Sequence, residues 1–172
     1  MTGTTYSVPP IPPDDAHTTY VDAGALRIGV EYRLLDTAEL AANYEGDQMT
    51  EIQDALDGAV AEDNGASIHV LGREDGHEYL RFDLFEQGPH YHYIALGGQE
   101  QTIIDFDRVA LGEMLPWALS QLRNRVVPML ERAGGEKLAR EVEVHAGRLH
   151  DSLAEVERLV KVAQAELAKI KR

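Results

Sequence analysis

Hydrophobic and polar residues alternate in the stretch LRIGVEYR (26–33), which places the apolar side chains on one face of an extended backbone and the polar ones on the other. Such alternation is typical of an antiparallel strand with one buried face. The β-prone residues 18–21 and the Asp-Ala-Gly turn after them predict a partner strand just before it.

A second β-rich region follows further along the chain. Four runs rich in aromatic and β-branched residues are joined by short polar turns, at 67–72, 77–86, 90–96 and 102–106. The connections are too short for crossovers, so neighbouring strands must run antiparallel, as in a meander. Together the two regions predict an α+β fold with five or six antiparallel strands and helices packed on one face of the sheet.

The segment 36–63 has helical periodicity instead. Asp36 with Glu39 forms a possible capping box, and Thr50 with Gln53 forms a second one. After the second box the apolar residues recur at helical spacing, at Ile52, Ala55, Leu56, Ala59 and Val60. We therefore expect amphipathic helices between the two β regions.

The same segment is strongly acidic. No Lys or Arg lies between Arg33 and Arg73. Two interpretations stay open for residues 36–63: a solvated helix face, or a docking surface for a basic protein partner.

Residues 136–170 carry the longest helical pattern, after a shorter helical region at 107–133 that ends at Gly134. From Leu149 onward the apolar residues follow the heptad spacing of a coiled coil. This seam consists of Leu149, Leu153, Val156, Val160, Ala163, Leu167 and Ile170. One helix of this length would be roughly 50 Å long. Because that exceeds a domain of this size, we expect the seam to meet a second copy, most simply in a dimer, or another protein.

These patterns divide the chain into three parts. Residues 1–17 hold four prolines in five positions, which block a helix and favour an extended arm. This arm is either a solvated tail or a ligand for a proline-binding domain. Residues 18–134 form the α+β domain, and residues 135–172 form the long amphipathic, coiled-coil-like helix.

Composition narrows the classes of function. The net charge is −14, and all four lysines follow residue 136, which argues against nucleic-acid binding because that relies on Lys and Arg. We expect no membrane association either, since no apolar run approaches the roughly 18 residues of a membrane span and no secretory signal begins the chain. Cysteine is absent, which fits a reducing compartment. The expected location is the cytoplasm.

The densest group of reactive side chains lies in EYLRFDLFEQGPHYHYIAL (78–96). The two histidines of HYHY are two positions apart and share one face of a strand, and the two tyrosines share the other. Whether Asp83 on the preceding strand faces the histidines or the tyrosines depends on the register of the hairpin, which stays open. The candidate ligand-binding residues are Arg81, Asp83, His90, Tyr91, His92 and Tyr93.

Two imidazoles on one strand face can bind Zn, Fe, Cu or Ni when a third ligand joins them. The possible third ligands are Asp83, His69, Glu86 and Asp105. We take His90, His92 and Asp83 as candidate ligands of a divalent transition metal. Two alternatives stay open: ordinary cross-strand packing, or a pocket for a small molecule or peptide.

No motif of a known catalytic class is present, such as a G-x-S-x-G elbow, a phosphate loop, a dinucleotide fingerprint or H-E-x-x-H. This absence and the long last helix favour a non-enzymatic binding or assembly module that self-associates or docks a partner. The alternative is a small metal-binding protein or enzyme that uses the His90 and His92 face. An open histidine face would favour the second hypothesis, and one packed under a helix the first.

Overall fold

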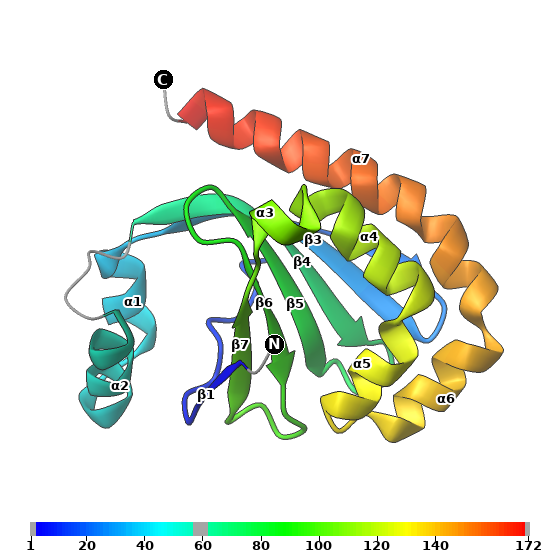
Figure 1. Cartoon of the computed structure of the whole chain (residues 1–172), viewed down its shortest axis with the longest axis horizontal. Helices are drawn as coiled ribbons and strands as arrows, with labels where there is room; N and C mark the ends of the chain where they lie inside the picture. Colours follow the sequence, from blue (N-terminus) through cyan, green and yellow to red (C-terminus); the bar gives the residue numbers. More distant parts are fainter. Residues whose placement is uncertain (1–2, 57–61, 171–172) are drawn as a thin grey trace.

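The computed structural model describes residues 3–56 and 62–170 and has an α+β fold, as predicted (Figure 1). Its strands form one antiparallel sheet in the order β1-β7-β6-β5-β4-β3-β2. The strands are β1 (Thr4–Tyr6), β2 (Thr18–Ala23), β3 (Leu26–Leu35), β4 (Asp63–Gly72), β5 (Glu78–Phe85), β6 (His90–Ile94) and β7 (Gln101–Asp105). The helices are α1 (Thr37–Asn43), α2 (Gly46–Leu56), α3 (Arg108–Leu111), α4 (Met114–Asn124), α5 (Val126–Arg132), α6 (Glu136–Val144) and α7 (Ala146–Ile170).

The sheet has seven strands rather than the predicted five or six, because the N-terminal arm contributes β1 at its edge. Thr4 pairs with Ile103 of β7, and the chain then crosses the sheet to reach β2 at the opposite edge. We call the crossing residues 7–17 the strap. Val8 is fully buried and Ile11 nearly so. The predicted solvated tail is therefore wrong for the described part of the arm, which packs on the sheet.

The two faces of the sheet are covered differently. Helices α4 to α7 cover the face that carries the apolar positions of the predicted alternation (Figure 1). Leu26, Ile28 and Phe82 are fully buried there, and Trp117 of α4 meets Phe82 edge-on with ring centroids 6.0 Å apart. The strap and the α1–α2 pair lie on the other face, which carries the polar positions.

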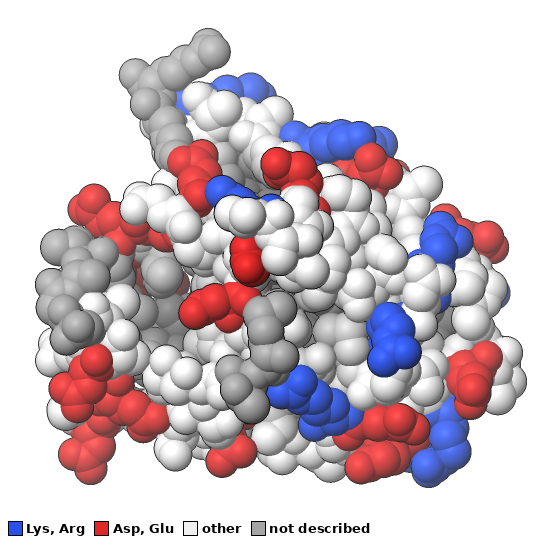
Figure 2. All heavy atoms as spheres, viewed as in Figure 1, with Lys and Arg blue, Asp and Glu red and all other residues white. Residues whose placement is uncertain are grey.

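In the α1–α2 pair, α1 begins at the predicted capping residue, but α2 does not. Asp36 caps α1 and accepts a hydrogen bond from the backbone N–H of Glu39 at 2.8 Å. The second capping box is wrong, because α2 already begins at Gly46 and Thr50 Oγ1 donates to the carbonyl of Gly46 within the helix, at 3.2 Å. Ala59 and Val60 of the predicted stripe lie outside the described residues. Acidic side chains gather over this pair on the face shown in Figure 2.

The predicted single helix over 136–170 is broken at His145, which has φ −114° and ψ 25°. The break falls where the apolar spacing of the sequence drifts away from the heptad. It changes the direction of the chain, so that α7 runs back across β2, β3 and β4 (Figure 1). None of the described helices combines the length and hydropathy required to cross a membrane.

The seam of α7 packs on the chain's own sheet. Six of its seven residues are buried in the single chain: Leu149, Leu153, Val156, Val160, Ala163 and Leu167. Only Ile170 is open, at 51% exposure. The reason for expecting a partner, a stripe that outruns its own domain, does not hold for this helix of 25 residues. Dimer formation stays a prediction, without that reason behind it.

Leu153→Ala tests whether the seam is core. Leu153 is 3% exposed, so the substitution should lower the free energy of unfolding by about 2–5 kcal/mol. Ile170→Ala, on the same helix, should change it by less than about 0.5 kcal/mol. Urea unfolding followed by circular dichroism measures both values. Measuring the wild-type midpoint at about 1 and about 100 µM protein tests the predicted dimer separately. A midpoint that rises with concentration would mean that a second copy stabilises the fold.

Candidate functional site

The register of the β5–β6 hairpin puts Asp83 on the histidine face. Asp83 pairs with His90, and Arg81 pairs with His92. Side chains of directly opposite residues lie on the same face of a sheet. Four of the six predicted ligand-binding residues therefore meet beneath the strap.

Tyr91 and Tyr93 lie on the other face and do not join this site. Both are buried in the main core, where the rings of Tyr91 and Trp117 have centroids 5.0 Å apart. The guanidinium of Arg132 lies 4.1 Å from the centre of the Tyr93 ring. The sheet separates these tyrosines from the histidines, so the predicted ligand-binding set is divided in two.

Two imidazoles and one carboxylate converge on the polar face. Asp83 Oδ2 lies 2.8 Å from His92 Nε2 and 3.3 Å from His90 Nε2. The three donor atoms all lie within 4.8 Å of one another. Asp83 and His92 are buried, and the His90 side chain is 19% exposed. We call these three residues the triad.

The other polar atoms of the triad are held by neighbours. His90 Nδ1 lies 2.7 Å from the carbonyl of Gly88, and His92 Nδ1 lies 2.8 Å from Gln101 Oε1. Ser67 Oγ donates to Asp83 Oδ1. An Nε2 atom that is hydrogen-bonded to the Asp83 carboxylate donates its proton to it. Once that proton is lost, the ring keeps its other proton on the Nδ1 that faces a carbonyl oxygen, and Nε2 offers a lone pair. With the Gln101 amide in this orientation, Gly88 and Gln101 orient the two rings so that both Nε2 atoms point towards Asp83 Oδ2.

The charges within the triad depend on one another. Burial opposes the ionised form of Asp83, but the hydrogen bonds and charges of His90 and His92 outweigh it and hold the pKa of Asp83 well below its usual range. Burial also opposes the charged form of His90, yet the hydrogen bond and charge of Asp83 prevail and raise the pKa of His90. For His92 burial prevails, and its pKa is lowered.

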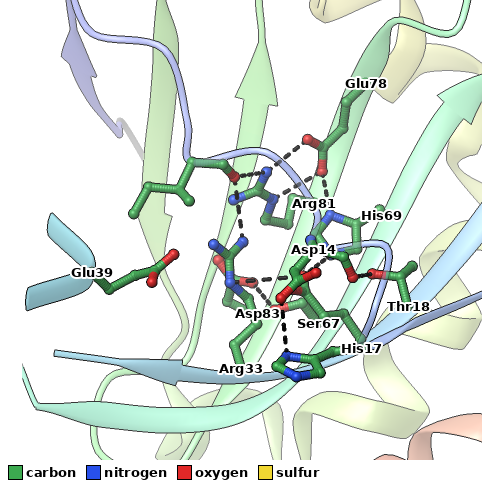
Figure 3. A network of polar contacts seen from close by, with 12 residues as sticks. Asp14, His17, Thr18, Arg33, Glu39, Ser67, His69, Glu78, Arg81 and Asp83 are labelled. Carbon is green, nitrogen blue, oxygen red and sulfur yellow. Dashed lines mark hydrogen bonds and ion pairs between the residues drawn. The ribbon is translucent and has the colours of Figure 1, made fainter. Parts of the chain in front are cut away.

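A second polar cluster lies next to the triad, around His69 (Figure 3). His69 is fully buried; its Nε2 lies 2.8 Å from Glu31 Oε2 and its Nδ1 lies 2.6 Å from Glu78 Oε1. Ionised carboxylates only accept hydrogen bonds, so a ring that serves both must donate from both nitrogens and carry a positive charge. Arg81 donates to both oxygens of Glu78, at 2.8 and 2.7 Å.

This pairing decides between the possible third ligands. His69 is committed to its two glutamates, and Glu86 is exposed beyond the end of β5. Asp105 lines the same cavity as the triad from β7. Asp83 is the carboxylate that the structure brings to both histidines.

The strap closes this cluster from above. The carbonyl of Ile11 accepts from Arg81 Nη2 at 2.7 Å and from Arg33 Nη1 at 3.4 Å. The backbone N–H of Asp14 donates to Glu31 Oε1 at 3.0 Å. An extended segment rich in proline suits this position because it offers carbonyl acceptors while leaving few N–H groups to satisfy.

A cavity of about 270 Å³ lies between the strap, the α1–α2 pair and strands β5 to β7. Its polar floor includes Arg33, Asp83, His90, His92 and Gln101. Its apolar wall comes from α1 and α2, through Leu40, Tyr44, Ile52 and Leu56. The histidine face is therefore open to a pocket rather than packed under a helix.

The residues that support the triad and the His69 cluster were not among the predicted site residues; they include Ser67 and Gln101 beside the triad, and Glu31 and Glu78 beside His69. One signal pointed to them. Polar residues occupy every second position on successive strands, as in Glu31 with Arg33 and Ser67 with His69. Such a pattern is typical of a solvent-facing side, since burial of so many charges is uncommon.

A protein-family model described as a domain of unknown function (DUF7700) matches residues 20–160. The matched region contains the triad and the His69 cluster and begins after the strap. No curated protein and no solved structure gives a significant match.

Glu78→Gln tests the buried charge cluster. Burial opposes ionisation of Glu78, but the charges of Arg81 and His69 and their hydrogen bonds outweigh it, so the pKa of Glu78 lies below its ordinary value. The stability it contributes is therefore present above the pKa of about 4.3 in the unfolded chain and is lost as the pH falls through lower values. The variant should lose about 3–5 kcal/mol of unfolding free energy at pH 7.

The pH profile provides the check. Urea unfolding between about pH 6 and pH 3 should show a smaller loss of stability in Glu78→Gln than in the wild type. Glu143→Gln, at an exposed position of α6, should keep the wild-type profile. Parallel profiles for the wild type and Glu78→Gln would contradict the assignment.

Proposed function

We propose a function for this chain, which belongs to the DUF7700 family of unknown function, from the chemistry of its site. In this proposal, His90, His92 and Asp83 bind one divalent transition-metal ion at the floor of a small-molecule pocket. The family description names no activity, so the chemistry of the site carries the proposal. A metal-binding protein or enzyme is thereby preferred to a module that only assembles.

The convergence of the three donor atoms is the observation that carries the proposal. Around an ion held at about 2.1 Å from each ligand, neighbouring donor atoms would be roughly 3.0–3.4 Å apart. The two distances from Asp83 Oδ2 to the Nε2 atoms are 2.8 and 3.3 Å. Two of the three donor separations therefore already suit bonds to a metal, and the third lies within 4.8 Å.

The neighbours of the triad support the same conclusion. Histidines that ligate a metal almost always donate their other ring N–H to a carbonyl, a carboxylate or water, which fixes the ring and its tautomer. Gly88 and Gln101 offer such acceptors to His90 and His92, and Ser67 holds the second oxygen of Asp83. Ordinary cross-strand packing of two histidines requires none of these three contacts.

The pocket distinguishes a working site from a purely structural one. Structural zinc sites are closed by four protein ligands, whereas three ligands leave a position open to water or substrate. Two imidazoles and one carboxylate suit Zn²⁺ and Fe²⁺ in particular. Here the open position would face the cavity of about 270 Å³. A bound small molecule could thus contact the metal directly.

The other predicted function, assembly through α7, has weaker support. Most of its seam is buried in the single chain, and Ile170 is the member that remains open to a partner. The acidic surface of α1 and α2 stays a second possible docking region (Figure 2).

Metal titration tests the proposal. Untagged, metal-free protein should bind one Zn²⁺ per chain with a dissociation constant of about 1 µM or tighter by calorimetry. His90→Ala should weaken binding at least about tenfold, because it removes a ligand, and Gln101→Leu should weaken it by about 10–100-fold, because it frees the ring of His92. Titration with Co²⁺ should give a visible absorption band that the His90 variant loses.

His145→Ala is the matched control, since His145 is exposed at the junction of α6 and α7. It should bind Zn²⁺ like the wild type. Absence of stoichiometric binding by the wild type, or equal loss in the control, would remove the metal site.

A further inference from the structure

Arg33 is a buried cation with hydrogen-bonding capacity to spare. Its side chain is 7% exposed and lines the cavity. Within the described part of the chain, its contacts are Nε to Glu31 Oε2 at 3.7 Å and Nη1 to the carbonyl of Ile11 at 3.4 Å. Arg81, by contrast, makes two bonds of 2.8 Å or shorter to Glu78. A guanidinium carries five N–H donors in a fork, so Arg33 keeps donors for a ligand in the cavity.

The rest of the cavity limits the ligand that Arg33 would meet. Leu40, Ile52 and Leu56 present hydrocarbon to the cavity from α1 and α2. The volume of about 270 Å³ is below the roughly 300–1,000 Å³ of drug-sized sites. An apolar wall with a buried guanidinium at the floor fits a small molecule that has a single anionic group.

The charges nearby favour a carboxylate over a phosphate. Asp83 and Asp105 also line the cavity, and they would repel a dianion more than a monoanion. Arg81 lines the cavity as well, but its guanidinium is committed to Glu78 and to the carbonyl of Ile11. Glu39 projects from α1 towards Arg33 in Figure 3, but its carboxylate accepts from Asn43 Nδ2 at 3.3 Å. One guanidinium fork matches the two oxygens of one carboxylate.

We propose that the cavity binds a small monocarboxylic acid, with its carboxylate on Arg33 and its hydrocarbon part against α1 and α2. This deepens the proposed function and rests on it for the role of the bound acid, because the triad lies on the same cavity floor. The contact with Arg33 itself does not depend on a metal, so the two proposals can fail separately.

Hexanoate and hexanamide are suitable probes, because they share a chain length and differ in the charge of the head group. Titration by NMR of the full chain, with and without Zn²⁺, should show hexanoate binding at least about tenfold more tightly than hexanamide. Arg33→Met should abolish this preference. Arg33→Lys should retain part of the preference, since it keeps the charge but loses the fork.

Ile52→Trp is a second variant that leaves Arg33 in place. Ile52 is a half-buried residue of the cavity wall, and the larger ring should fill the cavity and weaken hexanoate binding at least about tenfold. Circular dichroism establishes that each variant is folded, and Ile52→Trp decides the question if Arg33→Met does not fold.

The outcomes separate the two proposals. Equal binding of both probes by the wild type overturns the carboxylate site, as does a preference that survives Arg33→Met. Unchanged hexanoate binding by Ile52→Trp also overturns it, because the ligand then lies elsewhere. A preference that depends on Arg33 in a chain that binds no Zn²⁺ supports the carboxylate site and overturns only the metal proposal.

Discussion

The pairing of buried charges on one face of the sheet is the constraint on which this structure depends. Glu31, His69, Glu78 and Arg81 lie side by side on β3, β4 and β5, where water is largely excluded. An unpaired charge at such a depth costs several kcal/mol, so each group must have its partner in place. A shift of one residue between these strands would carry every charge to the apolar face. Pairing of these charges therefore favours this register over its neighbours.

The strap and the triad follow from the same constraint. A sheet face that carries charges needs a cover with polar groups, and the strap supplies the carbonyl of Ile11 to both Arg33 and Arg81. The strap and the α1–α2 pair do not meet tightly over β5 to β7, which leaves the cavity. Asp83, His90 and His92 lie at its floor, next to the paired charges around His69. Neighbours whose hydrogen bonds are satisfied help to hold the side chains of a binding site in place.

Local periodicity in the sequence predicted most of the strands and helices. The alternation in 26–33 and the short turns in 67–106 predicted six of the strands and their antiparallel pairing. The seventh was missed because Thr4–Tyr6 is too short to show alternation and is paired with β7, which lies about a hundred residues away. The helix over 136–170 was recognised as helical, but its break at His145 was not. A polar residue in an apolar seam does not reveal that the two halves pack in different directions.

The sequence by itself determined which side chains share a face, because a strand alternates with a period of two whatever surrounds it. It placed His90 with His92, set Tyr91 apart from both, and defined the apolar stripe of α7. Only the tertiary structure decided what each face meets, because register and packing depend on contacts between distant segments. It brought Asp83 to the histidines, turned the α7 stripe onto the chain's own sheet, and laid the strap over the charged face. Local spacing fixes the orientation of a side chain, and long-range pairing fixes its partner.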